Sequence, residues 1–160
     1  MLQVLQGNRQ KFFQATNSIF GKLGTKAPLN MTLSLIDIFC IPVLSYALEA
    51  LNLTKSERST LDFTYSTVFF KLFKVKDKLN IKLCQFYSGC LPPSCRLDIK
   101  KLNFVNALQF LKNSMPMQLI AIGGREEFVS LANKYKLASY DRGFLIKSKV
   151  FEWFASDLSI

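Results

Sequence analysis

The feature that most constrains the fold is an almost entirely apolar segment, residues 33–51, with a proline inside it at position 42. A helix of this length could cross a membrane. Its polar residues, however, fall along one narrow helical stripe, namely Ser34, Asp37, Ser45 and Glu49. A helix in the protein core with one edge exposed to solvent explains this stripe better than a membrane span does. Because Pro42 cannot donate to the carbonyl of Ile38, we predict a kink there.

The remaining segments also have helical periodicity, and no clear two-residue alternation indicates a strand. Gly24 is placed to close the first helix, Thr54-Lys55-Ser56-Glu57 is a capping box that starts the third, and Ser94 could cap the fifth. The predicted helices span about residues 2–22, 30–51, 55–74, 78–89, 94–113, 125–136 and 141–157. We therefore predict an all-α fold, a single bundle of about six to seven helices with the second kinked at Pro42.

Breakers near the C-terminal third divide this bundle. Pro116 and the pair Gly123-Gly124 interrupt the helical pattern there. We assign residues 1–114 to the main helical domain and residues 115–160 to a C-terminal helical extension packed on it.

The chain is basic, with 21 Lys and Arg against 11 Asp and Glu, no His, and a formal net charge of +10. This excess favours anionic partners such as nucleic acid or a lipid surface, although an ordinary basic soluble protein is the simpler reading. A hydrophobic fraction of 49% argues against disorder. The first residues, 1–7, are too polar for a signal peptide, so we expect an intracellular protein, nuclear or cytoplasmic, with reduced cysteines.

No catalytic or metal-binding set is visible. Cys84, Cys90 and Cys95 surround a Pro-Pro turn, but their spacing is not that of a zinc knuckle and no His could complete it. The aspartates are far apart in the sequence, and the adjacent pair Glu126-Glu127 suits a helix N-terminus. No phosphate-cradling glycine loop is present. We predict no independent enzyme activity, no catalytic residue, no metal and no cofactor.

The candidate site lies on and just after the helix that starts at Thr54. Phe63 and Phe70 are seven residues apart, so they share one face of this helix, away from its core stripe. Basic residues beside exposed aromatic rings suit a groove that follows a nucleic-acid backbone. The alternative is that both rings pack under another helix and the lysines form a solvated rim. The predicted nucleic-acid-binding residues are Lys71, Lys74, Lys76, Lys78, Lys82, Phe63 and Phe70.

A resemblance adds to this reading. Residues 40–50 are Cys-Ile-Pro-Val-Leu-Ser-Tyr-Ala-Leu-Glu-Ala, which fits the pattern C-x-P-x-L-x-Y-(G/A)-x-E. Further pieces flank it, namely residues 9–13, 15–22, 53–54, 61–62, 69–73, 91–93 and 96–99. In this order they resemble the C-terminal thumb region of non-LTR (LINE-type) retrotransposon reverse transcriptases.

The resemblance implies a helical unit that grips a template–primer duplex behind a polymerase active site. The expected partners are therefore a duplex or RNA–DNA hybrid, bound without sequence preference, and also a polymerase palm or fingers domain, but no membrane. The paired aspartates of that family's palm are absent, so no catalytic residue carries over to this chain. The alternative is an orphan retroelement-derived fragment that acts, if at all, as a protein-interaction or structural domain.

Overall fold

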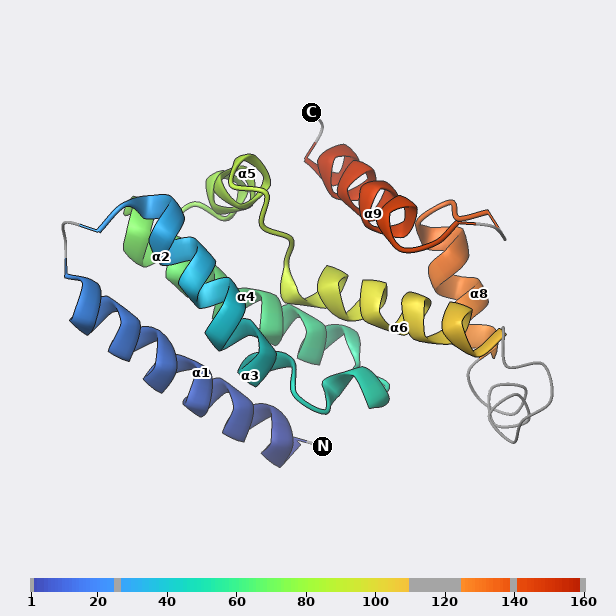
Figure 1. Cartoon of the computed structure of the whole chain (residues 1–160), viewed down its shortest axis with the longest axis horizontal. Helices are drawn as coiled ribbons and strands as arrows, with labels where there is room; N and C mark the ends of the chain where they lie inside the picture. Colours follow the sequence, from blue (N-terminus) through green and yellow to red (C-terminus); the bar gives the residue numbers. More distant parts are fainter. Residues whose placement is uncertain (1, 25–26, 110–124, 139–140, 159–160) are drawn as a thin grey trace. The chain divides into compact units, whose positions relative to one another are not determined.

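The computed structural model describes residues 2–24, 27–109, 125–138 and 141–158. All regular secondary structure within these ranges is helical, which confirms the predicted all-α class (Figure 1). The described helices number 7 when the continuous rod from α2 through α3 is taken as one and the three-residue 3-10 helix η2 is left out. The elements are α1 (Leu2–Leu23), α2 (Leu29–Leu35), the π-helix η1 (Ile36–Cys40), α3 (Ile41–Ser45), the 3-10 helix η2 (Leu48–Ala50), α4 (Lys55–Phe73), α5 (Lys78–Tyr87), α6 (Pro93–Gln109), α8 (Arg125–Lys134) and α9 (Phe144–Asp157).

The chain divides into two compact units, unit 1 (Met1–Ser94) and unit 2 (Cys95–Ile160). The boundary that we predicted between residues 114 and 115 lies outside the described residues, as do Pro116, Gly123-Gly124 and the expected helix end near Asn113.

In unit 1, α1 lies alongside the rod α2–η1–α3 and also contacts α4 (Figure 1). Fully buried rings and aliphatic side chains fill the space between them, among them Phe12 of α1, Leu44 of α3 and Phe69 of α4. Two polar contacts fix the register of α4. The Tyr65 hydroxyl donates to Asp37 at 2.7 Å, and Arg9 Nε donates to Thr64 Oγ1 at 3.0 Å.

Just before Pro42, where we predicted a kink, the rod contains a π-helix. In residues 36–40 the backbone hydrogen bonds span five residues instead of four, so the Ile41 amide donates to the Ile36 carbonyl. The next residue, Pro42, has no N–H to continue the hydrogen-bond pattern.

The rod also ends earlier than the predicted position near Leu51. The α-helix stops at Ser45, and Ala47 adopts a left-handed conformation with φ of 60° before the short 3-10 helix η2. Asn8 of α1 accounts for this end, because its Nδ2 donates to the carbonyls of Leu44 (3.3 Å) and Tyr46 (2.8 Å). A side chain from another helix thus satisfies carbonyls that a longer helix would have satisfied internally.

The predicted cap residues have mixed outcomes. Gly24 is left-handed at φ of +64°, and the Thr54–Glu57 capping box is present, so both predictions are confirmed. The predicted cap at Ser94 is wrong, because α6 already begins at Pro93. Proline suits the first helical position, where its missing N–H costs nothing.

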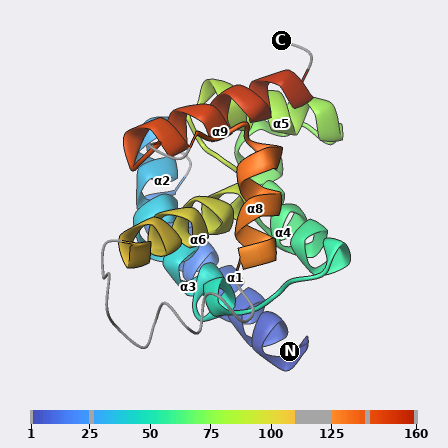
Figure 2. The ribbon, with the colours of Figure 1, turned by 90° about the vertical axis from the view of Figure 1, so that its right-hand side faces the viewer.

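In unit 2, α8 runs between α9 and α6 (Figure 2). A buried polar cluster joins these helices. Asp98 of α6 accepts from the hydroxyl of Tyr135 at 2.7 Å and from Lys134 Nζ at 3.0 Å. The Lys134 ammonium also lies 4.5 Å from the ring centroids of Tyr135 and Trp153. Burial, and then the neighbouring Cys95 and Asp98, raise the pKa of the Tyr135 hydroxyl, so it stays a donor.

Hydropathy along the described helices gives no segment that is both long enough and apolar enough to cross a membrane.

Candidate nucleic-acid interface

A groove of about 920 Å³ lies between α4 and α5 in unit 1. On α4 its lining residues recur every three or four positions from Lys55 to Phe70, so they form one continuous helical face. On α5 the lining starts at Lys78 and continues through Ile81 and Gln85. We call this feature the α4–α5 groove.

Five of the seven predicted site residues line the α4–α5 groove, namely Phe63, Phe70, Lys76, Lys78 and Lys82. The structure thus brings together the two rings of α4 and the lysines that follow it. The connection is short, since α5 begins only five residues after α4 ends.

Lys71 and Lys74 are not among the residues that line the groove. Lys71 points to α1, where its Nζ donates to Asn17 Oδ1 at 2.7 Å and lies 5.6 Å from the centre of the Phe20 ring. Lys74 is the left-handed C-cap of α4, and its amide donates to the Phe70 carbonyl.

The two phenylalanines keep much of their surface exposed, with 67% for Phe63 and 41% for Phe70. By contrast Leu61, Tyr65 and Val68, on the opposite face of α4, are buried. The predicted division of this helix into a core face and a second aromatic face is therefore present, and no described helix of unit 1 covers Phe63.

Sequence reasoning missed two cations of the groove, Lys55 and Arg58. On α4, Lys55 lies eight residues before Phe63 and Arg58 lies four residues before Asp62, which also lines the groove. Helical periodicity could have found them, because residues three or four apart, or two turns apart, lie on one side of a helix.

The electrostatic balance of the lining is positive, because Asp62 is its one acidic residue against five basic ones. The Asp62 carboxylate accepts from the amide of Ser94 at 2.9 Å and from its hydroxyl at 2.7 Å. Ser94 stands in the first turn of α6, where a carboxylate is stabilised by the free amides and the helix dipole.

Three of the lysines have no ion-pair partner among the residues that the structure describes, namely Lys55, Lys76 and Lys78. Lys55 is the first residue of α4 and Lys78 the first of α5. Asp77, between Lys76 and Lys78 in the sequence, is the N-cap of α5, and its carboxylate accepts from the Asn80 amide at 3.0 Å. Lys55 therefore stands at the start of α4, and Lys76 and Lys78 stand just beyond its end, so the three ammonium groups line the groove from both ends of this helix.

At the floor of the groove lies Gln85, which is only 2% exposed. Its Nε2 donor has no hydrogen-bond partner. A buried amide without a partner costs stability, so it is an unusual choice of side chain for a purely structural position.

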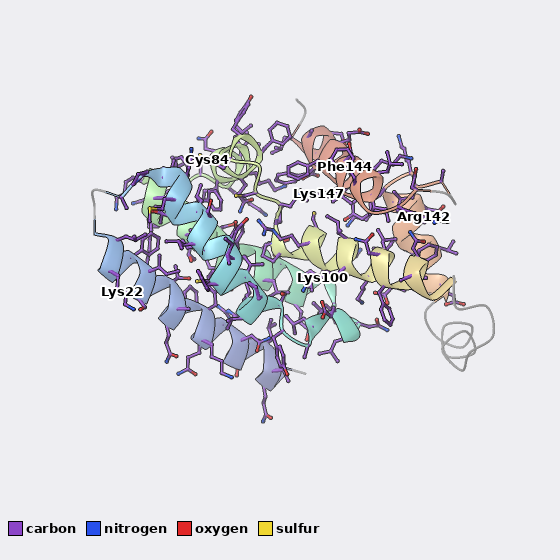
Figure 3. The ribbon with its side chains drawn as sticks, viewed as in Figure 1. Lys22, Cys84, Lys100, Arg142, Phe144 and Lys147 are labelled. Carbon is purple, nitrogen blue, oxygen red and sulfur yellow. The ribbon has the colours of Figure 1, made fainter. Side chains whose placement is uncertain are left out.

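Within the described ranges, no group of three or more His, Cys, Asp or Glu side chains could hold a metal ion. None of the four cysteines forms a disulfide, including Cys84 on α5 (Figure 3). Burial raises the pKa of the Cys40 thiol, and a hydrogen bond with Thr16 partly opposes this rise.

Comparison with protein-family models, with curated proteins and with solved structures found no match for this chain.

Proposed function

We propose that the chain is a non-catalytic nucleic-acid-binding module whose α4–α5 groove holds the sugar–phosphate backbone without sequence preference. The observation that carries this proposal is that Lys55, Lys76 and Lys78, all without ion-pair partners, line one groove. Unpaired ammonium groups along one groove suit a polyanion, because each can replace a condensed counterion on a phosphate.

The resemblance to reverse transcriptase thumbs points the same way, since the thumb is the part that grips a template–primer backbone. Under this proposal the natural partners are a duplex or hybrid nucleic acid and a separate polymerase palm or fingers domain, and the protein works inside the cell. Catalysis would belong to that partner.

The test is a salt titration of binding to a short fluorescein-labelled duplex, followed by fluorescence anisotropy. The triple variant Lys55→Gln, Lys76→Gln, Lys78→Gln should weaken binding and reduce the slope of log K against log salt by about 0.9 for each phosphate that the protein no longer neutralises. The matched control removes the same charge at exposed sites outside the groove, with Lys11→Gln, Lys22→Gln and Lys147→Gln. Equally weakened binding in both triple variants, or no binding at low salt, would refute the proposal.

A protein-interaction role is the second candidate, and a separate observation favours it. Apolar side chains remain exposed along the rod α2–η1–α3 and just after it, with 50% for Met31, 63% for Ile38, 60% for Phe39 and 73% for Tyr46. Contiguous exposed apolar surface is typical of interaction sites. Concentration-dependent self-association in sedimentation velocity, abolished in Ile38→Ser with Phe39→Ser, together with no affinity for nucleic acid, would favour this role.

A further inference from the structure

The α4–α5 groove is lined by apolar side chains as well as by basic ones. Phe63, Phe70, Ile81 and Pro92 contribute apolar surface, and the lysines without ion pairs line the same groove. A duplex turns its phosphates outward and keeps the flat faces of its bases stacked inside, so it offers lysines a partner but offers aromatic rings nothing to stack on. An unpaired strand exposes both parts at once.

The spacing of the two rings suits such a strand. Phe63 and Phe70 are seven residues apart on one face of α4, which places them about 10 Å apart along the helix axis at 1.5 Å per residue. A stacked strand rises about 3.4 Å per nucleotide, so the rings are separated by about three nucleotide steps. Two bases of one short segment can therefore each meet a ring.

We propose that the α4–α5 groove binds an unpaired segment of nucleic acid, with bases against Phe63 and Phe70 and phosphates against Lys55, Lys76 and Lys78. This inference rests on the proposed function and adds the strandedness of the ligand, which the resemblance alone would give as a duplex. Aromatic stacking is tolerant of sequence because every base has a π-face, so this binding needs no base-specific contact.

The experiment compares two probes with the full chain. One is a labelled single-stranded DNA of about 12 nucleotides, within the range of single-strand site sizes, and the other is the same strand annealed to its complement. We expect the single strand to bind more tightly. Phe63→Leu, which keeps apolar volume but removes the ring, should weaken single-strand binding by about fivefold or more and leave duplex binding unchanged.

A matched control and a rescue variant guard against indirect effects. Phe144→Leu replaces a ring of α9 that is 81% exposed and belongs to unit 2 (Figure 3), so it should change neither affinity. Phe63→Trp keeps an aromatic ring, so it should bind the single strand more tightly than Phe63→Leu does. In a Trp153→Phe background, which removes the single natural tryptophan, the fluorescence of the new indole should be quenched by the stacked base.

The outcomes separate this inference from the proposed function. Equal or tighter duplex binding, or single-strand binding that Phe63→Leu leaves unchanged, overturns the single-strand inference. The proposed function still stands in that case if the lysine triple variant weakens duplex binding. No binding of either probe at low salt removes both.

Discussion

At the residue scale, Lys55 and Lys78 occupy positions that stability alone would not select. Each is the first residue of its helix, where the dipole is positive and a cation is repelled. Neither forms an ion pair in the described ranges, although a carboxylate stands at each helix start, Glu57 in the first turn of α4 and Asp77 as the cap of α5. Locally unfavourable residues are expected at functional or strained sites, so these two positions agree with the proposed function.

This placement predicts opposite effects of one charge reversal at two helix ends. Lys55→Glu should raise the free energy of unfolding by about 0.3–1 kcal/mol, because a carboxylate suits a helix N-terminus, while it weakens nucleic-acid binding. Lys22→Glu, in the last turn of α1 (Figure 3), should lower that free energy by a similar amount and leave binding largely intact. Urea denaturation and anisotropy measure the two quantities. A destabilised Lys55→Glu would show that the dipole argument fails at this site.

Gln85 gives a second residue-scale prediction. Because its buried Nε2 lacks a partner, Gln85→Met should remove that unmet donor at nearly the same volume and raise the free energy of unfolding by about 1 kcal/mol. The control Gln10→Met changes an exposed glutamine of α1 and should have almost no effect. Urea denaturation checks both, and a loss of stability in Gln85→Met would mean that the folded chain satisfies this amide.

At the element scale, the start of α4 depends on the Thr54–Glu57 capping box. Glu57 Oε2 accepts from the Thr54 amide at 2.8 Å, and the Glu57 amide donates to Thr54 Oγ1 at 3.3 Å. The hydrogen bond from the Thr54 backbone, and then that from its side chain, lower the pKa of Glu57 below its ordinary 4.5. The ionised carboxylate is therefore the form that the folded state favours.

This lowered pKa predicts how the capping box responds to acid. The stabilisation by Glu57 is fully present above the ordinary pKa and is lost as the pH falls through the lower pKa of the folded state. Glu57→Gln should therefore have a lower free energy of unfolding than the natural chain at pH 7. This difference should shrink as the pH falls below the ordinary pKa of a glutamate. Thr54→Ala should cost about 1 kcal/mol at neutral pH. Urea unfolding at several pH values measures both, and a deficit of Glu57→Gln that does not change with pH would contradict this account.

The helices differ in how far the sequence could predict them. Gly24 and the box at Thr54 were predictable because cap and partner lie within a few residues of each other. The end of α3 at Ser45 was not, because the donor that satisfies its carbonyls is Asn8, 36 residues away from Leu44. The wrong cap at Ser94 has the same cause, since the carboxylate that it meets belongs to Asp62 on another helix.

The candidate groove was likewise predictable only where its residues lie on one helix. Helical periodicity places Phe63 and Phe70 on one face of α4, and it could also have indicated Lys55 and Arg58. Which lysines meet those rings depends instead on how α5 folds back onto α4. Lys71, adjacent to Phe70 in the sequence, turns to Asn17 of α1. Lys82, twelve residues beyond Phe70, lines the groove.

At the scale of the whole molecule, the α4–α5 groove and every residue proposed to bind nucleic acid there belong to unit 1. Residues 1–94 contain eleven Lys and Arg against five Asp and Glu. They also enclose a core of their own, with Phe12, Leu44 and Phe69 fully buried. The proposed activity therefore needs no residue of unit 2.

This separation predicts that a chain of residues 1–94 folds alone and binds. A segment of this size can bury enough apolar surface to be stable, so its circular dichroism should be helical and its urea unfolding cooperative. Its affinity should stay within a few fold of that of the full chain, with the same salt slope, because that slope reports how many phosphates the groove neutralises. The lysine triple variant in the short chain serves as the control. A folded short chain with a distinctly smaller salt slope would show that basic residues of unit 2 also bind the ligand, since the slope falls only when fewer phosphates are neutralised.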